Sequence, residues 1–108
     1  MKLNYNETFL FLDKIASEKD VILPFAYKDI YYSLVCFCEE NAVYSQDTEC
    51  FCFEGSIRFF SDKFNVPKRV IQEAFSCFSC IGILTFVDRT PKLSAFYLFF
   101  PYFNFEKE

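Results

Sequence analysis

The sequence predicts one α+β domain that is mostly helical and ends in a β-hairpin. Its 108 residues are a common size for one domain, so a two-domain enzyme with an interdomain cleft is not expected. Apolar side chains recur every three or four positions in four segments between residues 6 and 82, as in helices that bury one face. After Gly82, two apolar runs flank a short polar stretch, which is typical of a hairpin.

The first two helices are predicted in the N-terminal half of the chain. Residues 6–17 follow the candidate cap Asn6, and their apolar positions are Phe9, Leu10, Leu12, Ile15 and Ala16. A second helix is predicted from residue 27 to residue 41, with apolar positions at Ile30, Tyr31, Leu34, Val35, Phe37 and Cys38. Pro24 disfavours a helix immediately before it, so residues 21–25 are predicted to be extended.

A polar segment and a short strand follow these two helices. Residues 41–49 are polar enough to be a loop, and residues 50–53 are predicted to be a strand that ends at Glu54 and Gly55. A short helix then begins after Ser56, and its apolar side is formed by Ile57, Phe59, Phe60 and Phe64.

The last helix and the hairpin complete the pattern. Asn65 tolerates a left-handed turn, and Pro67 suits the first position of the next helix. The apolar stripe of that helix continues to Gly82, which marks its end. Residues 83–87 and 93–100 are predicted strands, and residues 88–92 are the polar turn between them.

Composition excludes several function classes. Hydrophobic residues make up 53% of the chain and aromatic residues 22%, so a disordered chain is excluded and a sizeable core is expected. The chain has no His, which removes Ser-His, Cys-His and His-ligated metal chemistry. It has no glycine-rich phosphate loop, and its acidic residues are scattered along polar faces. We therefore expect no enzyme and no cofactor.

The N-terminus and the apolar runs predict a cytoplasmic protein. The apolar run after Lys2 breaks at Asp13 and Lys14, so no signal peptide is apparent. No apolar stretch reaches about 18 residues, so no membrane span is expected.

Six cysteines leave two interpretations open. The pairs are Cys36 and Cys38, Cys50 and Cys52, and Cys77 and Cys80. The favoured interpretation is that these are reduced thiols acting as small buried hydrophobes. The alternative is a thiolate metal site, which the strand neighbours Cys50 and Cys52 could share but the helical pair Cys36 and Cys38 could not.

Two stretches carry a resemblance to a known family. Residues 53–75 read FEGSIRFFSDKFNVPKRVIQEAF and look like the helix-turn-helix of bacterial, plasmid and phage winged-helix proteins. Residues 78–84 read FSCIGIL and are similar to the ending that usually follows it. The predicted helix before them lies where replication-initiator domains of this type carry their first buried helix. These motifs are mostly core positions, so they are specific for the fold rather than for a target.

The resemblance implies a winged helix-turn-helix domain over residues 1–108. Residues 1–20 would be an N-terminal helix and residues 22–100 the winged-helix core. The helix at 67–80 would enter the major groove of double-stranded DNA, and the wing at 88–92 would contact phosphates. The chain departs from the family where Phe59 and Phe60 replace a small alanine, and where the wing offers few basic residues.

Charge is distributed unevenly along the chain. Residues 1–54 hold 4 basic and 10 acidic side chains, a net −6, whereas residues 55–92 hold 6 and 3, a net +3. The basic segment is therefore the predicted helix-turn-helix and wing. The candidate phosphate contacts are Arg58, Lys63, Lys68, Arg69, Arg89 and Lys92, and the candidate base contacts are Gln72 and Ser76. The alternative is that these are ordinary solvated surface residues.

Two functions are consistent with these features. The first is a DNA-binding protein of a phage or other mobile element, acting in transcriptional regulation or replication initiation. Because six phosphate contacts give weak binding, we expect a homodimer, with the N-terminal helix either pairing protomers or closing its own core. The second is a protein-interaction module on the same scaffold, without DNA binding. Its partner would meet the aromatic C-terminal strand, which could instead cover the first helix.

Overall fold

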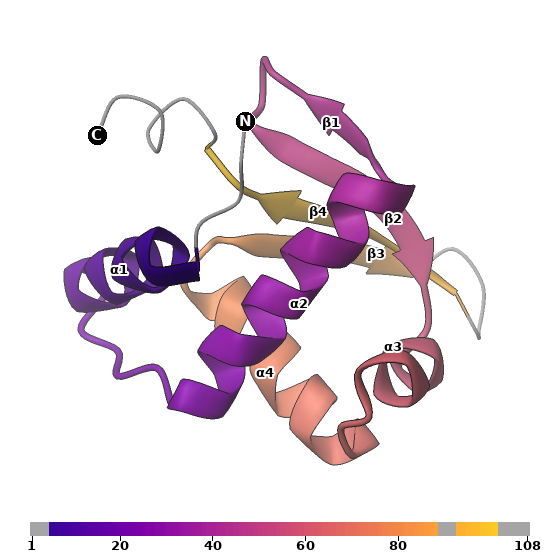
Figure 1. Ribbon diagram of the computed structural model, residues 1–108, viewed down its shortest axis with the longest axis horizontal. Helices are drawn as coiled ribbons and strands as arrows, with labels where there is room; N and C mark the ends of the chain where they lie inside the picture. The colour runs from indigo at the N-terminus through magenta and orange to yellow at the C-terminus, as the bar shows by residue number, and fades with distance from the viewer. Residues whose placement is uncertain (1–4, 89–92, 102–108) are drawn as a thin grey trace.

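In the part of the chain that the structure describes, four helices lie on the same side of a four-stranded antiparallel sheet, which confirms the α+β class (Figure 1). The computed structural model describes residues 5–88 and 93–101. The helices are α1 (Tyr5–Glu18), α2 (Phe25–Asn41), α3 (Ile57–Phe64) and α4 (Lys68–Cys80). The strands are β1 (Val43–Ser45), β2 (Cys50–Gly55), β3 (Leu84–Asp88) and β4 (Ser94–Phe99).

The sheet order is β1-β2-β4-β3, so β4, the last of the described strands along the chain, lies inside the sheet. β4 pairs with β3 in the predicted hairpin and, on its other side, with β2 from Cys50↔Phe99 to Gly55↔Ser94. The prediction of a loop over residues 41–49 is wrong at Val43–Ser45, which form β1 beside β2. Three residues are too short a run for alternation to reveal a strand.

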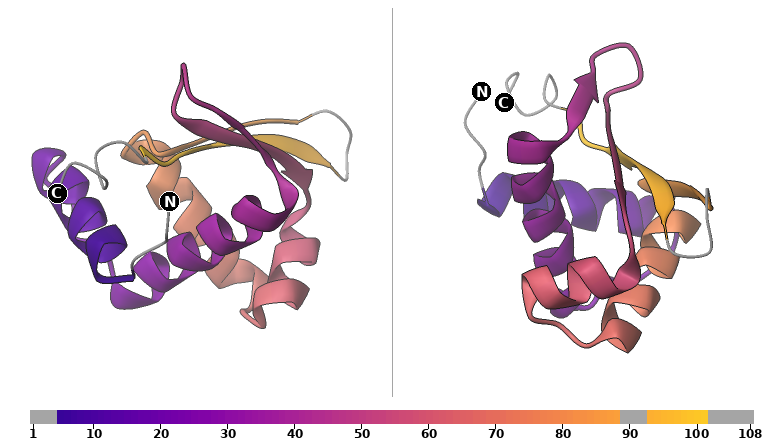
Figure 2. Two further views of the ribbon diagram at one scale, coloured as in Figure 1. Left: turned by 45° about the horizontal axis from the view of Figure 1, so that its top comes forward. Right: turned by 90° about the vertical axis from the view of Figure 1, so that its right-hand side faces the viewer.

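Alternation along the strands separates a covered face from an open one. Phe51 and Phe53 of β2 are buried, as are Phe96 and Leu98, their partners on β4. The other side of the sheet carries Cys52, Glu54 and Tyr97, which are exposed. In the left view of Figure 2, the helices lie beneath the sheet and leave its upper face uncovered by the described residues.

The N-terminal helices pack against each other. α1 buries Thr8, Leu12 and Ala16, and α2 buries a longer stripe of Ile30, Tyr31, Leu34, Val35 and Cys38. α2 begins at Phe25, two residues before the predicted start, because Pro24 acts as its N-cap. The apolar side of α1 is largely buried against the rest of the domain, although the Leu10 side chain remains 68% exposed.

The bulky pair Phe59 and Phe60 is accommodated by an aromatic cluster. Phe60 is fully buried, and its ring lies 5.7–5.8 Å from five others, those of Phe37, Phe53, Phe64, Phe75 and Phe96. Phe59 stays 44% exposed at the edge of this cluster. The space for the Phe60 ring exists because Gly55 has no side chain, since a Cβ there would lie 2.7 Å from the ring.

A three-residue turn joins α3 to α4. Ser56 caps α3 by accepting a hydrogen bond from the Phe59 amide at 3.0 Å. Asn65 adopts the predicted left-handed conformation, with φ 55° and ψ 48°. The Ser61 hydroxyl donates a hydrogen bond to the Val66 carbonyl at 2.6 Å, and Pro67 then precedes α4. After α4, Gly82 has φ 81°, which favours glycine and ends the helix as predicted.

Candidate nucleic-acid interface

The structure brings six of the eight predicted DNA-contacting residues onto two helices that pack together, α3 and α4. All six are exposed: Arg58 and Lys63 on α3, and Lys68, Arg69, Gln72 and Ser76 on α4. The remaining two, Arg89 and Lys92, lie outside the described residues. Two helices that pack together therefore carry four exposed basic side chains and two exposed polar ones.

α4 turns one side to the core and the opposite side to solvent. Its buried side is formed by Ile71, Ala74, Phe75 and Phe78. Because an α-helix repeats after about 3.6 residues, the opposite side carries Arg69, Gln72, Glu73 and Ser76, each of them exposed. We call these four residues the outer face of α4. It combines one cation, one anion and two neutral groups that can hydrogen-bond.

The N-terminus of α4 is open to an anion. Pro67 is the N-cap residue and makes no side-chain hydrogen bond to the first turn of the helix. The amide groups of a first helical turn carry a partial positive charge and point away from the helix. The exposed side chain of Lys68 lies at the same end. This end of α4 therefore suits a phosphate group.

Lys63 is held against the aromatic cluster. Its ammonium nitrogen lies 5.5 Å from the centroid of the Phe37 ring, a cation–π distance. The long side chain of Lys63 therefore runs over apolar surface while its charge stays in solvent. Such a contact restricts where the charge can lie and keeps it beside α3.

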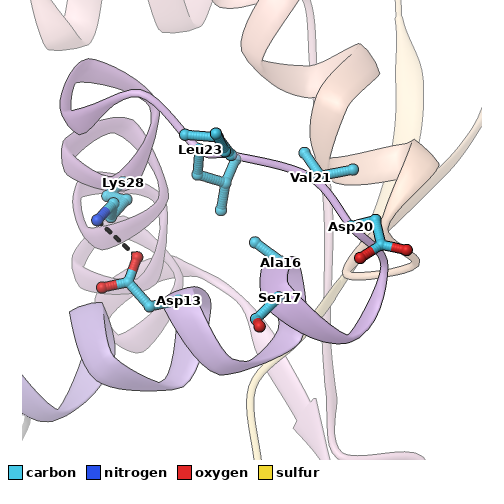
Figure 3. Close-up of a pocket in the computed structure, with 8 residues that line it drawn as sticks. Asp13, Ala16, Ser17, Asp20, Val21, Leu23 and Lys28 are labelled. Carbon is cyan, nitrogen blue, oxygen red and sulfur yellow. Dashed lines mark ion pairs between the residues drawn. The ribbon is translucent and has the colours of Figure 1, made fainter.

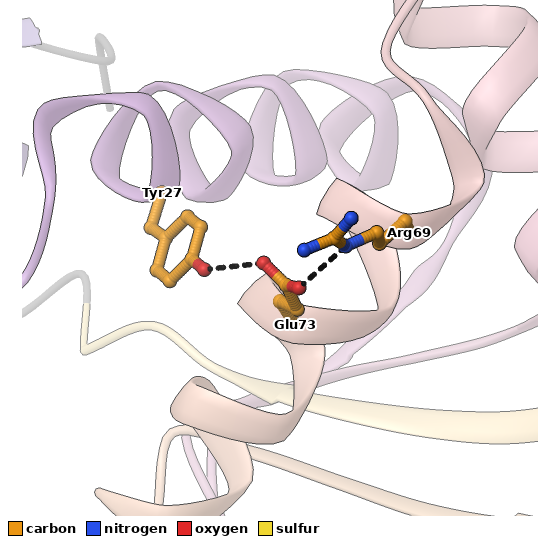
Figure 4. A network of polar contacts seen from close by, with 3 residues as sticks. All are labelled: Tyr27, Arg69 and Glu73. Atoms are coloured by element: carbon orange, nitrogen blue, oxygen red, sulfur yellow. Dashed lines mark hydrogen bonds and ion pairs between the residues drawn. The ribbon is translucent and has the colours of Figure 1, made fainter.

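Glu73 joins two elements through a polar network (Figure 4). The Tyr27 hydroxyl of α2 donates a hydrogen bond to Glu73 Oε2 at 3.2 Å. The Arg69 Nε group donates to Glu73 Oε1 at 3.1 Å, one helical turn away. Burial raises the pKa of Tyr27, and the hydrogen bond to Glu73 raises it further, so the hydroxyl is a proton donor at neutral pH.

Sequence reasoning missed this network. The spacing of Arg69 and Glu73, four residues apart in a helix, is a signal that the sequence does carry. Tyr27 lies 46 residues from Glu73, and nothing in the local pattern places these two side chains together.

The cysteines fall into three environments. None of the six is paired in a disulfide bond, and the reduced state stays a prediction. Only Cys38 is fully buried, whereas Cys52 and Cys80 are exposed, so the interpretation as small buried hydrophobes is wrong for the latter two. Among the described residues, no three Cys, Asp, Glu or His side chains are grouped so that they could hold a metal ion.

The aromatic C-terminal strand is mostly core. Phe96, Leu98 and Phe100 are buried, and Tyr97 is 38% exposed on the open face of the sheet. The Phe99 ring lies 6.1 Å from the ring of Phe11, so this strand does pack on the first helix. On the open face, Tyr97 lies beside Cys52 in the pairing register, and Val43 and Val87 are 76% and 57% exposed.

A pocket of about 440 Å³ lies away from the predicted interface, between the end of α1 and the start of α2 (Figure 3). Its lining includes Asp13 and Lys28, whose charged atoms lie 2.6 Å apart in an ion pair. It is completed by Ala16, Ser17, Asp20, Val21, Ile22 and Leu23. None of these residues is a predicted site residue.

The helices in the described residues are too short or too polar to cross a membrane. Comparison of the chain with protein-family models, with curated proteins and with solved structures finds no match.

Proposed function

We propose that this chain is a DNA-binding protein of the winged-helix type, with α4 in the major groove and residues 88–92 against the phosphate backbone. The observation that supports the proposal is the outer face of α4, which is polar and exposed, on a helix that packs against α3 and its exposed Arg58 and Lys63. A helix with its side chains is about 10–12 Å across, which matches a major groove about 12 Å wide.

Each predicted residue has a defined role in this proposal. Gln72 and Ser76 face base edges from the middle of α4, where side chains of a recognition helix reach into the groove. Arg58, Lys63, Lys68 and Arg69 meet phosphates on either side, and Arg89 and Lys92 supply the wing contacts. A role in transcriptional control or replication initiation rests on the resemblance of residues 53–84 to domains of that kind.

The test removes the basic pair at the start of α4. We expect Lys68→Ala with Arg69→Ala to lower the affinity for random-sequence duplex DNA by about tenfold or more and to reduce its salt dependence. Binding is measured by fluorescence anisotropy at several salt concentrations. The matched control is Lys14→Ala with Lys19→Ala, two exposed lysines at α1 and the turn after it, which should bind almost as the unmodified protein does.

A second candidate is a protein-interaction module, which the open face of the sheet favours. The open face, which the helices do not cover, carries three exposed apolar or aromatic side chains, Val43, Val87 and Tyr97. If the unmodified protein fails to bind duplex DNA even at low salt, this second function replaces the first. Normal DNA binding by the Lys68→Ala and Arg69→Ala variant would instead show that α4 is not the recognition helix.

A further inference from the structure

The polar network on α4 leaves one part of Arg69 free. A guanidinium group has five N–H donors, one on Nε and four on the two terminal nitrogens. Nε donates to Glu73 Oε1 at 3.1 Å, which orients the plane of the guanidinium group. The Arg69 side chain is 87% exposed, so its two terminal nitrogens face solvent on the outer face of α4.

Glu73 is itself held in place. Its second oxygen accepts a hydrogen bond from Tyr27, which comes from a different helix, so the carboxylate is fixed to α2 as well as to α4. Figure 4 shows the three side chains in a row, with Glu73 between Tyr27 and Arg69. Side chains fixed before binding lose less conformational entropy when they meet a ligand.

The ligand that suits this arrangement is a base edge rather than a phosphate. The Glu73 carboxylate lies within hydrogen-bond distance of Arg69 and would repel a phosphate that approached the same guanidinium. Guanine presents two acceptors in the major groove, O6 and N7, and a guanidinium meets both with its terminal nitrogens. These are the donors that the network leaves free.

We propose that Arg69 reads one guanine in the major groove, and that Glu73 and Tyr27 are positioning residues for it. This inference rests on the proposed DNA binding and replaces the phosphate contact that the sequence predicts for Arg69. It makes Tyr27, on the first turn of α2, part of the specificity of the protein without any contact to DNA.

The experiment selects binding sites from a random duplex pool and then measures affinity for the best site and for its variants at each position. We expect the unmodified protein to require guanine at one position. Arg69→Lys keeps the charge but loses the bidentate contact to guanine. The preference for guanine over other bases at that position should therefore fall by about fivefold to 150-fold. Tyr27→Phe should reduce the same discrimination by a smaller factor and leave every other position unchanged.

The Glu73→Ala variant distinguishes a positioning role of Glu73 in DNA recognition from a role in stability alone. Removing the carboxylate should raise the affinity for non-specific duplex, because one repulsive charge is lost, while discrimination for guanine falls. Glu73→Gln keeps an acceptor for Arg69 Nε and should restore part of the discrimination. The control is Lys68→Ala, which should weaken binding to all sequences alike and leave the base preference unchanged.

The outcomes separate this inference from the proposed function. If the protein binds DNA and Arg69→Lys keeps the same base preference at every position, the assignment of Arg69 is wrong and the proposed function stands. Loss of discrimination in Arg69→Lys but not in Glu73→Ala or Tyr27→Phe would overturn the positioning roles alone. If the unmodified protein binds no duplex, both the function and this inference are wrong.

Discussion

Cys38 is fully buried on α2, and its environment differs from that of the other five thiols. Burial raises the pKa of the Cys38 thiol far above its ordinary range, because the thiolate would lose its hydration. Burial also raises the pKa values of Cys36, Cys50 and Cys77, which are half-buried. The folded protein therefore keeps these protons at a pH where the unfolded chain releases them.

This difference predicts a loss of stability in alkali. An unfolded thiol has a pKa of about 8.5, so the stabilisation is complete below that pH and is lost as pH rises toward the raised pKa of the folded state. Between pH 7 and pH 10, Cys38 alone should lower the free energy of unfolding by up to about 2 kcal/mol. Urea denaturation at a series of pH values between 7 and 10 measures this change in the free energy of unfolding.

A pair of variants assigns the effect to the buried thiol. Cys38→Ala should show a smaller loss of stability between pH 7 and pH 10 than the unmodified protein, whatever its stability at neutral pH. Cys52→Ala, at an exposed position, should show the same loss as the unmodified protein. Equal pH dependence in all three proteins would contradict the assignment.

At the scale of elements, β2 and α3 meet where the ring of Phe60 lies over Gly55. A Cβ at Gly55 would lie 2.7 Å from Phe60 Cε2 and 2.8 Å from Cζ, closer than packed atoms approach. Phe60 has little freedom to move away, because it is fully buried among other aromatic rings. Glycine is therefore required at this junction for space.

We predict that Gly55→Ala lowers the free energy of unfolding by about 1–3 kcal/mol, the usual cost of overpacking a core. In a Phe60→Leu background the same change should cost at least about 1 kcal/mol less, since the two positions are in contact. Urea denaturation of the four proteins measures the coupling. Phe99→Leu is the control background, because Phe99 lies at the other end of the β2–β4 pairing from Gly55 and packs on Phe11, so a similar rescue there would argue against direct overlap.

Local sequence patterns predict where the helices, strands and turns of this fold lie. They do not predict which of these elements pack together. The helices follow from apolar spacing, and Asn65 and Gly82 act as predicted because left-handed backbone favours their residue types. The place of β4 between β2 and β3 depends on pairing between distant segments, which spacing does not encode. The same limit applies to the site, where the exposed residues of α4 are predicted but the contact of Tyr27 with Glu73 is not.

For the whole molecule, charge is segregated along the chain. The net −6 of residues 1–54 belongs largely to α1, α2 and the strands after them, whereas residues 55–92 have a net +3 and include α3 and α4. A polyanion is repelled by the first region and attracted by the second. Charge alone therefore favours an approach of DNA from the side of α3 and α4.

The number of basic groups limits what one protomer can do. Residues 55–92 contain 6 basic side chains, and at most these neutralise phosphates when this segment of one protomer meets DNA. Such a protomer would show a slope of log affinity against log salt no steeper than about −5. We expect specific binding at physiological salt to need more contacts than one chain supplies, and a second copy of the chain to supply them.

We therefore predict two protomers on each duplex site and a salt slope steeper than about −5. The half-sites should lie about one helical turn apart, roughly 34–36 Å, or a multiple of this spacing. Light scattering of the complex gives the number of protomers, and anisotropy across a salt series gives the slope. A specific complex that contains one protomer, or a slope no steeper than about −5, would contradict the dimer.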